Sequence, residues 1–483
     1  MNKRKPVFVG LFLFSFACLA TLYSLVTPAF EAPDEVGHFY YISHLIRTHT
    51  LPHQIDSNSG EAHQPPLYYL IASLGASLGD VNDEGGAFHF NPSFTAGIPG
   101  PNINVGLHGS ADKFPYEGQA LALHLTRIVS VLMGAATIAL ILLFGWMIFP
   151  QQPGVGWLAA ILAAFNPQFL FISGSINNDN LLILLSTLAW IQALRTYHEP
   201  KKEGNWLLLG LLAAAGLLTK LNGLLIGAIA GLVLVIISLR EKSLKRFLVG
   251  ATEIALPVVL ISGWWFLRNQ QLYGDPLGWN IYSGIYAANE RQIPIALNEL
   301  TEIIKTQYHS FWGVFGWMNL FAPGWFFQII KAILVISLAG WIISVLKRWF
   351  KRLSDQQQQA IAWLIVIVVA QELLMFFIIM NCNASCYQGR YLFPAIGPIM
   401  ILLSLGIFHL FGRYAKVFLP ILVVLLIFSA IYIPLRVIQP AYDLTTLSTM
   451  ELREVPDLPV DFDQSFYTIR LDPDIKRSAA PVQ

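Results

Sequence analysis

The chain has 483 residues, of which 55% are hydrophobic and only 12% are charged, and its formal net charge is +1. Soluble proteins carry about 25% charged residues, so this composition excludes a soluble globular protein. The near-neutral charge gives no indication of nucleic-acid binding, and we expect no nucleic-acid partner.

Apolar runs of about 20 residues, each long enough to cross a bilayer, recur along most of the chain. They predict an all-α polytopic membrane protein with about eleven transmembrane helices. The first run follows the basic sequence MNKRK and is too long for a signal peptide, so we expect an uncleaved anchor. The expected spans are residues 6–29, 121–149, 154–175, 180–197, 206–220, 222–239, 247–267, 323–346, 360–380, 391–411 and 417–435.

The polar segments between the spans are of two kinds. Those on one side are short and mostly rich in Lys and Arg, as in RTYHEPKKEGN and LREKSLKR. Basic short loops stay in the cytoplasm, so we expect a multi-pass protein of the inner or plasma membrane, with a cytoplasmic N-terminus and an extracytoplasmic C-terminus. The transmembrane domain is then residues 1–435, with large outer loops at 30–120 and 268–322 and a short outer tail at 436–483.

The first outer loop holds two stretches that predict helices lying at the membrane surface. EVGHFYYISHLIRTHTLP, at 35–52, has apolar residues at helical spacing, and PPLYYLIASLGASLG, at 65–79, is apolar but too short to span. The Gly-, Pro- and Asn-rich remainder predicts an irregular loop, which is either a lid over a site or a connector. The chain has no GxxxxGK[ST] motif, so an ATP-driven machine is not expected.

Six motifs occur in order along most of the chain up to about residue 411. They are APDEVGHFYY, HQPPLYYL, NPQFLFISGSINNDNLL, WWFLRNQQLYGDP, SFWGVFGWMN and QGRYLFPAIGP. Together they resemble the membrane-embedded GT-C glycosyltransferases, and more narrowly their DUF2142-like branch. The resemblance implies a GT-C-like helix bundle and an inverting glycosyltransferase. Such an enzyme moves a sugar from a polyprenyl-phosphate donor to an envelope glycan, lipid or protein acceptor on the outer leaflet.

In enzymes of this kind, an acidic residue of the first outer loop deprotonates the acceptor, and the matching position here is Asp34. A carboxylate at the membrane boundary is partly desolvated, which raises its pKa and makes it a stronger base. The alternative for Asp34 is a simple interfacial acid. Glu35 is also a candidate catalytic residue, which would position the acceptor, help to hold a cation, or cap the helix that begins there.

Displacement of a phosphate from a sugar also needs cationic groups to stabilise the leaving anion. Lys220, Arg268 and Arg390 lie next to outer breaks, where positive charge is otherwise sparse. Each could bind the donor phosphate, for which the paired hydrogen bonds of Arg are well suited. The alternative for each is contact with lipid headgroups.

Further candidates for substrate binding are polar residues near the outer face and one acid inside a span. Asp179 could orient a sugar hydroxyl or His38, or cap the fourth span. Glu372 lies near the middle of the ninth span, where an ionisable group is costly, so it should face a cavity or pair with Arg268 or Arg390. The remaining candidates are His38, His63 and Tyr68.

The sequence leaves two questions open: whether the protein binds a metal ion, and whether it contains a disulfide. The His spacings match no zinc signature, and we expect no certain cofactor, although a divalent cation weakly held by Asp34 and Glu35 is an alternative. Cys382 and Cys386 share one short outer loop and either form a disulfide or stay as free thiols.

Two other functions compete with sugar transfer. The first is a lipid-carrier flippase or transporter, although transporters usually have duplicated halves, which this chain lacks. The second is a non-catalytic partner in envelope polysaccharide assembly. Membrane lipids are expected partners under every hypothesis.

Overall fold

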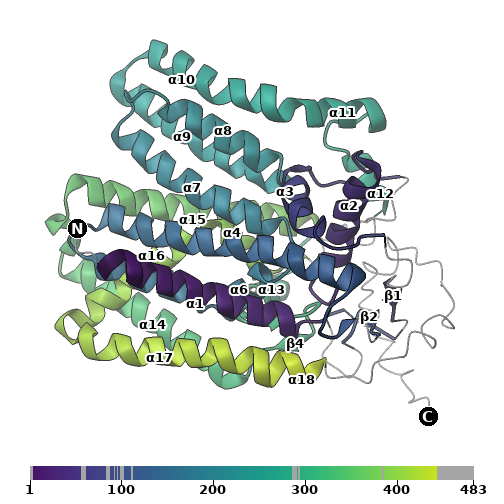
Figure 1. Ribbon diagram of the computed structural model, residues 1–483. Helices are drawn as coiled ribbons and strands as arrows, with labels where there is room; N and C mark the ends of the chain where they lie inside the picture. Colours follow the sequence, from purple (N-terminus) through teal and green to yellow (C-terminus); the bar gives the residue numbers. More distant parts are fainter. Residues whose placement is uncertain are drawn as a thin grey trace.

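The computed structural model describes residues 4–55, 61–82, 88–91, 93–94, 96–97, 103–109, 112–285, 291, 294–382 and 386–442. Almost all of the regular structure in this part of the chain is helical (Figure 1). The α-helices are α1 (Arg4–Val26), α2 (Glu35–Thr48), α3 (Leu67–Ala76), α4 (Gly118–Ile148), α5 (Pro153–Ala164), α6 (Pro167–Ser173), α7 (Asp179–His198), α8 (Asn205–Leu217), α9 (Leu224–Glu241), α10 (Leu244–Pro257), α11 (Gly263–Tyr273), α12 (Trp279–Ile285), α13 (Leu297–Trp312), α14 (Gly324–Leu346), α15 (Asp355–Asn381), α16 (Ile396–Phe411), α17 (Ala415–Ile433) and α18 (Gln439–Ala441).

Short helical turns and two small strand pairs complete the secondary structure. The turns are η2 (Leu221–Gly223), η3 (Val258–Ser262), η5 (Trp349–Arg352), η7 (Gly389–Ala395), η8 (Gly412–Tyr414) and η9 (Pro434–Ile438). Strand β1 (His89–Phe90) pairs antiparallel with β2 (Gly106–Leu107), with His89 opposite Leu107. Strand β3 (Val314–Phe315) pairs antiparallel with β4 (Leu320–Phe321), with Val314 opposite Phe321.

The predicted all-α membrane fold is confirmed, and every expected span is helical. In the described residues, eight helices are long and apolar enough to cross a membrane, and a ninth span forms if α5 and α6, which meet at 67°, are counted together. The bend falls at Asn166, because a residue before proline disfavours the helical conformation, and its side chain caps α6. The other two of the eleven expected spans correspond to α7, with 20 residues, and α8, with 13, which are helical but are not among these candidate spans.

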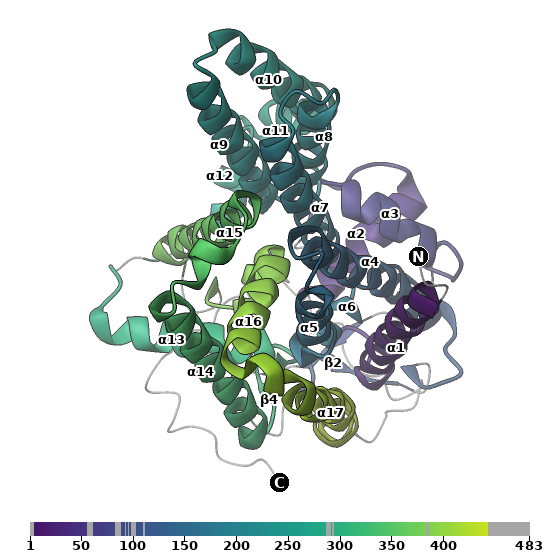
Figure 2. The ribbon, with the colours of Figure 1, turned by 90° about the vertical axis from the view of Figure 1, so that its left-hand side faces the viewer.

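Glycines allow several of these helices to approach closely. A side chain at Gly340 of α14 would overlap the backbone of Gly406 in α16, and Gly145 of α4 meets Gly156 of α5 in the same way. Small residues at such contacts are typical of membrane helix pairs. They allow α14 to pack closely on α16, and α4 on α5 (Figure 2).

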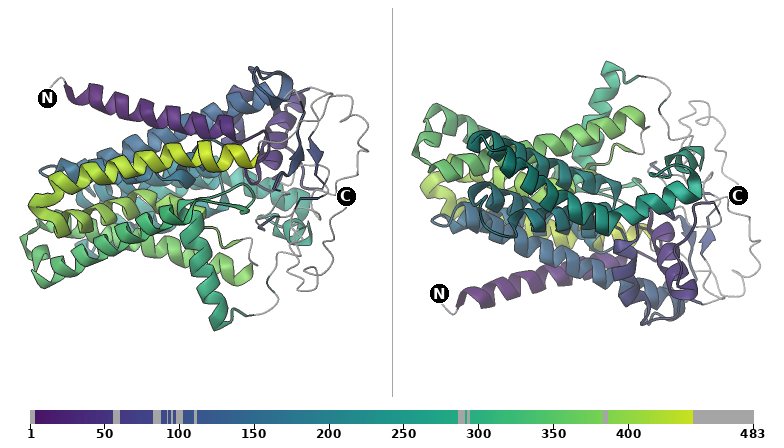
Figure 3. Two further views of the ribbon diagram at one scale, coloured as in Figure 1. Left: turned by 90° about the horizontal axis from the view of Figure 1, so that it is seen from below. Right: turned by 90° about the horizontal axis from the view of Figure 1, so that it is seen from above.

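Helices α2, α3 and α12 and strands β1 and β2 gather at one end of the bundle (Figures 1 and 3). Helices α2 and α3 pack on each other there, with the rings of Tyr41 and Tyr69 stacked 3.8 Å apart. Most of α2 is buried inside the protein, so it belongs to the core of the outer layer, whereas α3 exposes Leu70 and Leu74.

Glu31, an acidic residue shortly after the end of α1, binds the segment that contains strand β2. The carboxylate of Glu31 accepts hydrogen bonds from the backbone N–H groups of Val105 (2.9 Å) and Gly106 (3.1 Å). It also lies 2.7 Å from Nε2 of His108, whose other ring nitrogen is 3.2 Å from Asp112. The last helix was expected to end at 435, but it continues through η9 to Ala441. The predicted tail lies outside the described residues from position 443 onward.

Candidate active site

The turn between α1 and α2 gives Asp34 an unusual backbone conformation. Phe30 and Asp34 both have left-handed φ angles, of 68° and 66°. Few residues other than glycine adopt this conformation, and Asp is among those that tolerate it best. Such strain persists only where the surroundings enforce it, and here the enforcing group is Glu35, whose carboxylate accepts the N–H of Phe30 at 3.1 Å.

Glu35 is fully buried in an ion pair with Arg127 of α4. Arg127 donates to the two carboxylate oxygens at 2.8 and 2.6 Å, and its remaining donors reach the carbonyls of residues 24, 27 and 28. The backbone N–H of Ile176 is a further donor to Glu35, at 2.9 Å. The pair therefore ties the end of α1 to α4 and to the segment before α7, and we assign Glu35 a positioning role. Arg127 was missed in the sequence, although an ionisable residue within a span is itself a signal of a buried partner.

Asp34 pairs with Arg390 of η7, whose Nη2 donates to its Oδ2 at 2.6 Å. Arg390 is 2% exposed, and in the part of the chain that the structure describes its Nε and Nη1 have no hydrogen-bond partner. The Asp34 side chain is 20% exposed, so this pair lies where buried structure meets the outer surface. A buried guanidinium with donors to spare is a suitable binding group for an anion such as a phosphate.

A second ion pair lies beside the first. Lys220, between α8 and η2, donates to Asp179 at the start of α7 over 2.6 Å. Lys220 and Arg390 both lie against the ring of Tyr391, at 5.4 and 5.1 Å from its centre. Two cations thus flank one aromatic ring. Lys220 comes from the motif LTKLNG and Arg390 from QGRY, while SINNDN supplies Asp179, and the three motifs are far apart in the chain.

His38 and Glu61 complete the cluster. Nδ1 of His38 is 2.8 Å from the hydroxyl of Tyr69 and 3.9 Å from a carboxylate oxygen of Glu61. A side chain at Gly37 would lie 2.8 Å from Cγ of Glu61, so the absence of one lets Glu61 pack against α2. Sequence reasoning missed Glu61, although it lies two residues before the candidate His63.

The electrostatics of the cluster correct one expectation about Asp34. Burial by itself raises its pKa, as expected, but the charges of Arg390 and of other neighbours outweigh burial, and the pKa lies below its ordinary value. Burial raises the pKa of Glu61 to about 8, with a further contribution from the charge of Asp34. Burial also lowers the pKa of His38 to about 3. At neutral pH the cluster therefore holds an ionised Asp34, a protonated Glu61 and a neutral His38.

An aromatic rim borders the cluster on the side of the second outer loop. The ring of His63 lies 4.6 Å from that of Tyr282 in α12, and Tyr282 lies 5.1 Å from Trp279. The hydroxyl of Tyr282 is close enough to Glu61 and Asp34 for the charges of both carboxylates to act on it. His63 therefore lies at the edge of the site.

Tyr68 borders the cluster, with its ring centre 6.4 Å from that of His38, whereas the predicted site residues Arg268 and Glu372 lie apart from it. Tyr68 is fully buried, with its hydroxyl 2.9 Å from Ser130 and receiving the N–H of Asn177. Arg268 donates to the carbonyls of Leu51 and Pro52, so it fastens α11 to the first outer loop. Glu372 is exposed on α15, and neither of its two expected partners pairs with it, because Arg390 binds Asp34 and Arg268 binds backbone.

Asp34 and Glu35 do not converge on a common point. Their carboxylates bind Arg390 and Arg127, respectively, and both oxygens of Glu35 accept hydrogen bonds from protein donors. A cation shared by these two side chains does not fit this arrangement. Across the residues that the structure describes, no group of three or more His, Cys, Asp or Glu side chains is arranged to hold a metal.

The fold and site define a multi-pass membrane protein with a buried group of ionisable side chains at one end of the helix bundle. The solved structure of ArnT from Cupriavidus metallidurans bound to undecaprenyl phosphate is similar over 90% of this chain and 74% of that one, with a TM-score of 0.51 and 13% identity. At this identity the similarity concerns the fold. The apo form of that protein (TM-score 0.48, 14% identity, 91% and 74% covered) and the apo oligosaccharyltransferase of Archaeoglobus fulgidus (0.46, 13%, 92% and 57%) also match.

The family is shown by the sequence. Residues 118–400, more than half of the chain, match the family model described as "Predicted membrane protein (DUF2142)", and the chain belongs to this family. A search of the curated proteins finds no match.

Proposed function

We propose that the protein is an inverting glycosyltransferase that takes a sugar from a polyprenyl-phosphate donor and transfers it to a glycan, lipid or protein acceptor at the outer membrane surface. The observation that carries the proposal is the Asp34–Arg390 pair, which sets an ionised base 2.6 Å from a buried guanidinium with unused donors. Support comes from the fold, since ArnT of the same fold type was solved with undecaprenyl phosphate bound.

In the proposed reaction, the acceptor hydroxyl attacks the anomeric carbon of the donor sugar. Its proton passes to Asp34 while the bond between the anomeric carbon and the phosphate oxygen breaks. The departing polyprenyl phosphate carries the negative charge, which Arg390 and Lys220 stabilise. Atoms and charge balance without a nucleotide or a redox partner.

The low pKa of Asp34 in the free protein is compatible with its role as a base. A bound donor phosphate would share the charge of Arg390 and would add its own negative charge nearby. Both effects raise the pKa of Asp34 in the complex, so its basicity would increase once the donor has bound. Glu61, protonated at neutral pH, and Asp179 would hydrogen-bond sugar hydroxyls.

We further propose that this end of the bundle faces outward from the inner or plasma membrane. The basic turns, such as those around Lys202, Lys242 and Lys347, join helices at the end that carries the N-terminus (Figure 1). Basic turns of this kind stay in the cytoplasm. The acceptor would then be a component of the cell envelope.

The test is the Asp34→Asn variant, expressed in cells that lack the native gene. Asn tolerates the left-handed backbone of position 34 and can still accept a hydrogen bond from Arg390, so we expect normal amounts of folded protein. Mass spectrometry of the envelope glycans and lipids should show the loss of one sugar substituent. The matched control is Asp80→Asn, an exposed acid of the same outer loop, which should behave as wild type. Envelope sugars identical in Asp34→Asn and wild type would rule the proposal out.

A further inference from the structure

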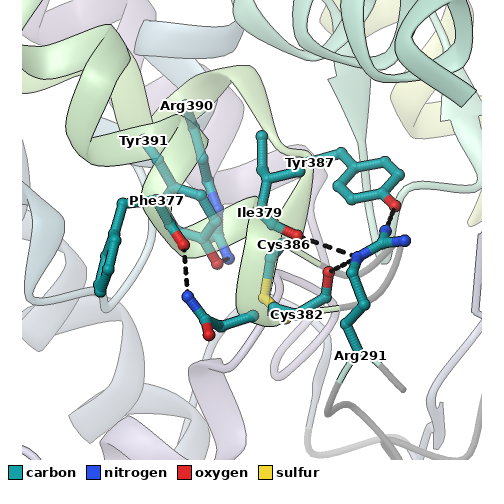
Figure 4. Close-up of a disulfide and its surroundings, with 9 residues drawn as sticks. Arg291, Phe377, Ile379, Cys382, Cys386, Tyr387, Arg390 and Tyr391 are labelled. Atoms are coloured by element: carbon teal, nitrogen blue, oxygen red, sulfur yellow. Dashed lines mark hydrogen bonds between the residues drawn. A yellow bond between two sulfur atoms is a disulfide. The ribbon is translucent and has the colours of Figure 1, made fainter. Parts of the chain in front are cut away.

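A disulfide lies a few residues before the anion-binding Arg390. Cys382, which follows α15, and Cys386 are bridged, with Cα atoms 5.9 Å apart. Tyr387 comes next in the chain, and Arg390 belongs to the turn that follows (Figure 4). The bridge thus closes the connection between a membrane helix and the segment that carries Arg390.

Arg291 of the second outer loop binds the same connection. Its Nε donates to the carbonyls of Ile379 (3.1 Å) and Cys382 (3.3 Å), and its backbone N–H donates to the carbonyl of Asn381 at 3.2 Å. Its guanidinium also makes a two-point contact with the carboxylate of Glu299 in α13, at 3.1 and 2.7 Å. Arg291 therefore joins the disulfide loop to α13.

Tyr387 links the same groups from the other side. Its hydroxyl contacts the guanidinium of Arg291 (Figure 4). It also donates to the carboxylate of Glu299. Its ring is buried in a small apolar cluster with Ile303 of α13 and Ile379 of α15. A tyrosine held by its hydroxyl and by its ring has little freedom to turn, and this fixes the backbone three residues before Arg390.

The last step from Tyr387 to Arg390 is also fixed on α13. The N–H of Gly389 donates to the hydroxyl of Ser310 at 2.7 Å. A side chain at Gly389 would overlap the backbone of Gln307 and Phe311, so only glycine permits this approach. These contacts fix the segment before Arg390 on the side of the disulfide and Arg291, while Arg390 itself is held by its donation to Asp34.

We propose that Arg291, Glu299, Tyr387 and the Cys382–Cys386 disulfide form a clasp that positions Arg390, and that opening the disulfide releases this clasp. Opening requires a dithiol reductant, which supplies two electrons and two protons to give two cysteine thiols and is itself oxidised to a disulfide. Once the segment is free, the side chain of Arg390 must be ordered when an anion binds, and this ordering lowers the affinity. The identity of the anion, the phosphate of a polyprenyl donor, rests on the proposed function. The positioning of Arg390 by the clasp does not depend on it.

The experiment uses the purified full-length protein in lipid nanodiscs. Hydrogen–deuterium exchange of residues 387–395 is compared among wild type, Cys382→Ser/Cys386→Ser, Glu299→Gln and the control Glu302→Gln. Glu302 lies in the same helix but is exposed, and it pairs with Lys305 at 2.8 Å. We expect faster exchange of this segment in the first two variants and in wild type treated with a dithiol. Exchange in Glu302→Gln should match untreated wild type, and the dithiol should have no further effect on the double Cys variant.

Binding of undecaprenyl phosphate to the same samples gives the second readout. The clasp variants should bind about tenfold more weakly, because the freed side chain of Arg390 must then be ordered on binding. Their thermal unfolding should stay close to that of wild type. Unchanged exchange in Glu299→Gln and in the double Cys variant would overturn the clasp. Faster exchange in both variants, together with no binding of undecaprenyl phosphate by wild type, would support the clasp and overturn the proposed donor.

Discussion

Asp34 and Glu35 are adjacent carboxylates with opposite surroundings. Glu35 is enclosed, and its two oxygens accept hydrogen bonds from Arg127 and from backbone N–H groups. Asp34 is partly exposed and faces Arg390. The left-handed turn at Asp34 separates the two side chains, so they bind different partners in the protein.

Glu61 gives a prediction on pH at the residue scale. Burial and the charge of Asp34 raise its pKa from an ordinary 4.5 to about 8, so the folded protein holds a proton that the unfolded chain releases at lower pH. The stability from this group is fully present below about pH 4.5 and is lost as the pH rises through 8. The Glu61→Gln variant, which cannot ionise, should therefore lose less stability than wild type between pH 5 and 8.

The measurement is the unfolding temperature of both proteins across this pH range. Asp80→Asn serves as the control, because its exposed side chain lies outside the cluster, and it should follow the wild-type curve. Parallel curves for wild type and Glu61→Gln would contradict the assignment of a raised pKa to Glu61.

At the scale of elements, the Glu35–Arg127 pair joins α1, α2, α4 and the segment before α7. Both side chains are fully buried. Removal of one charge leaves the other unpaired in a buried position, which costs about 3–5 kcal/mol. We therefore expect Glu35→Gln and Arg127→Gln to destabilise the protein strongly.

Thermal unfolding followed by tryptophan fluorescence measures this effect. The control variant is Glu299→Gln, which breaks an ion pair whose carboxylate is 30% exposed and should lower the unfolding temperature much less. A Glu35→Gln variant with wild-type stability would show that Glu35 does not anchor the turn, and would return it to the candidates for catalysis.

The helices could be predicted from the sequence more completely than the contacts within the candidate active site. Each apolar run of sufficient length gave a helix, because a span must satisfy its own backbone hydrogen bonds. The pairing of Asp34 with Arg390, 356 residues away, depends on how the helices pack, and no local pattern encodes it. Glu61 was missed for the same reason, since only packing against α2 shows that it is buried beside Asp34 and His38.

At the scale of the whole molecule, the charged clusters lie at one end of a largely apolar bundle. Segments at this end (Figure 1) supply the Asp34–Arg390 and Lys220–Asp179 pairs and the aromatic rim. They also supply the disulfide (Figure 4). The other end carries the N-terminus and the short basic turns. This asymmetry is compatible with the proposed substrate, which has a membrane-embedded tail and a polar headgroup.

The most direct test is binding of undecaprenyl phosphate, measured by native mass spectrometry on wild type, Arg390→Gln, Asp34→Asn and Arg246→Gln. Arg246 is a control, since it lies near the start of α10 and pairs with Glu241. We predict that Arg390→Gln binds at least about tenfold more weakly, because it loses charge-assisted hydrogen bonds to the phosphate. Asp34→Asn should bind as tightly as wild type or more tightly, since a negative charge near the phosphate is removed, and Arg246→Gln should be unchanged. Equal binding by wild type and Arg390→Gln would contradict the account.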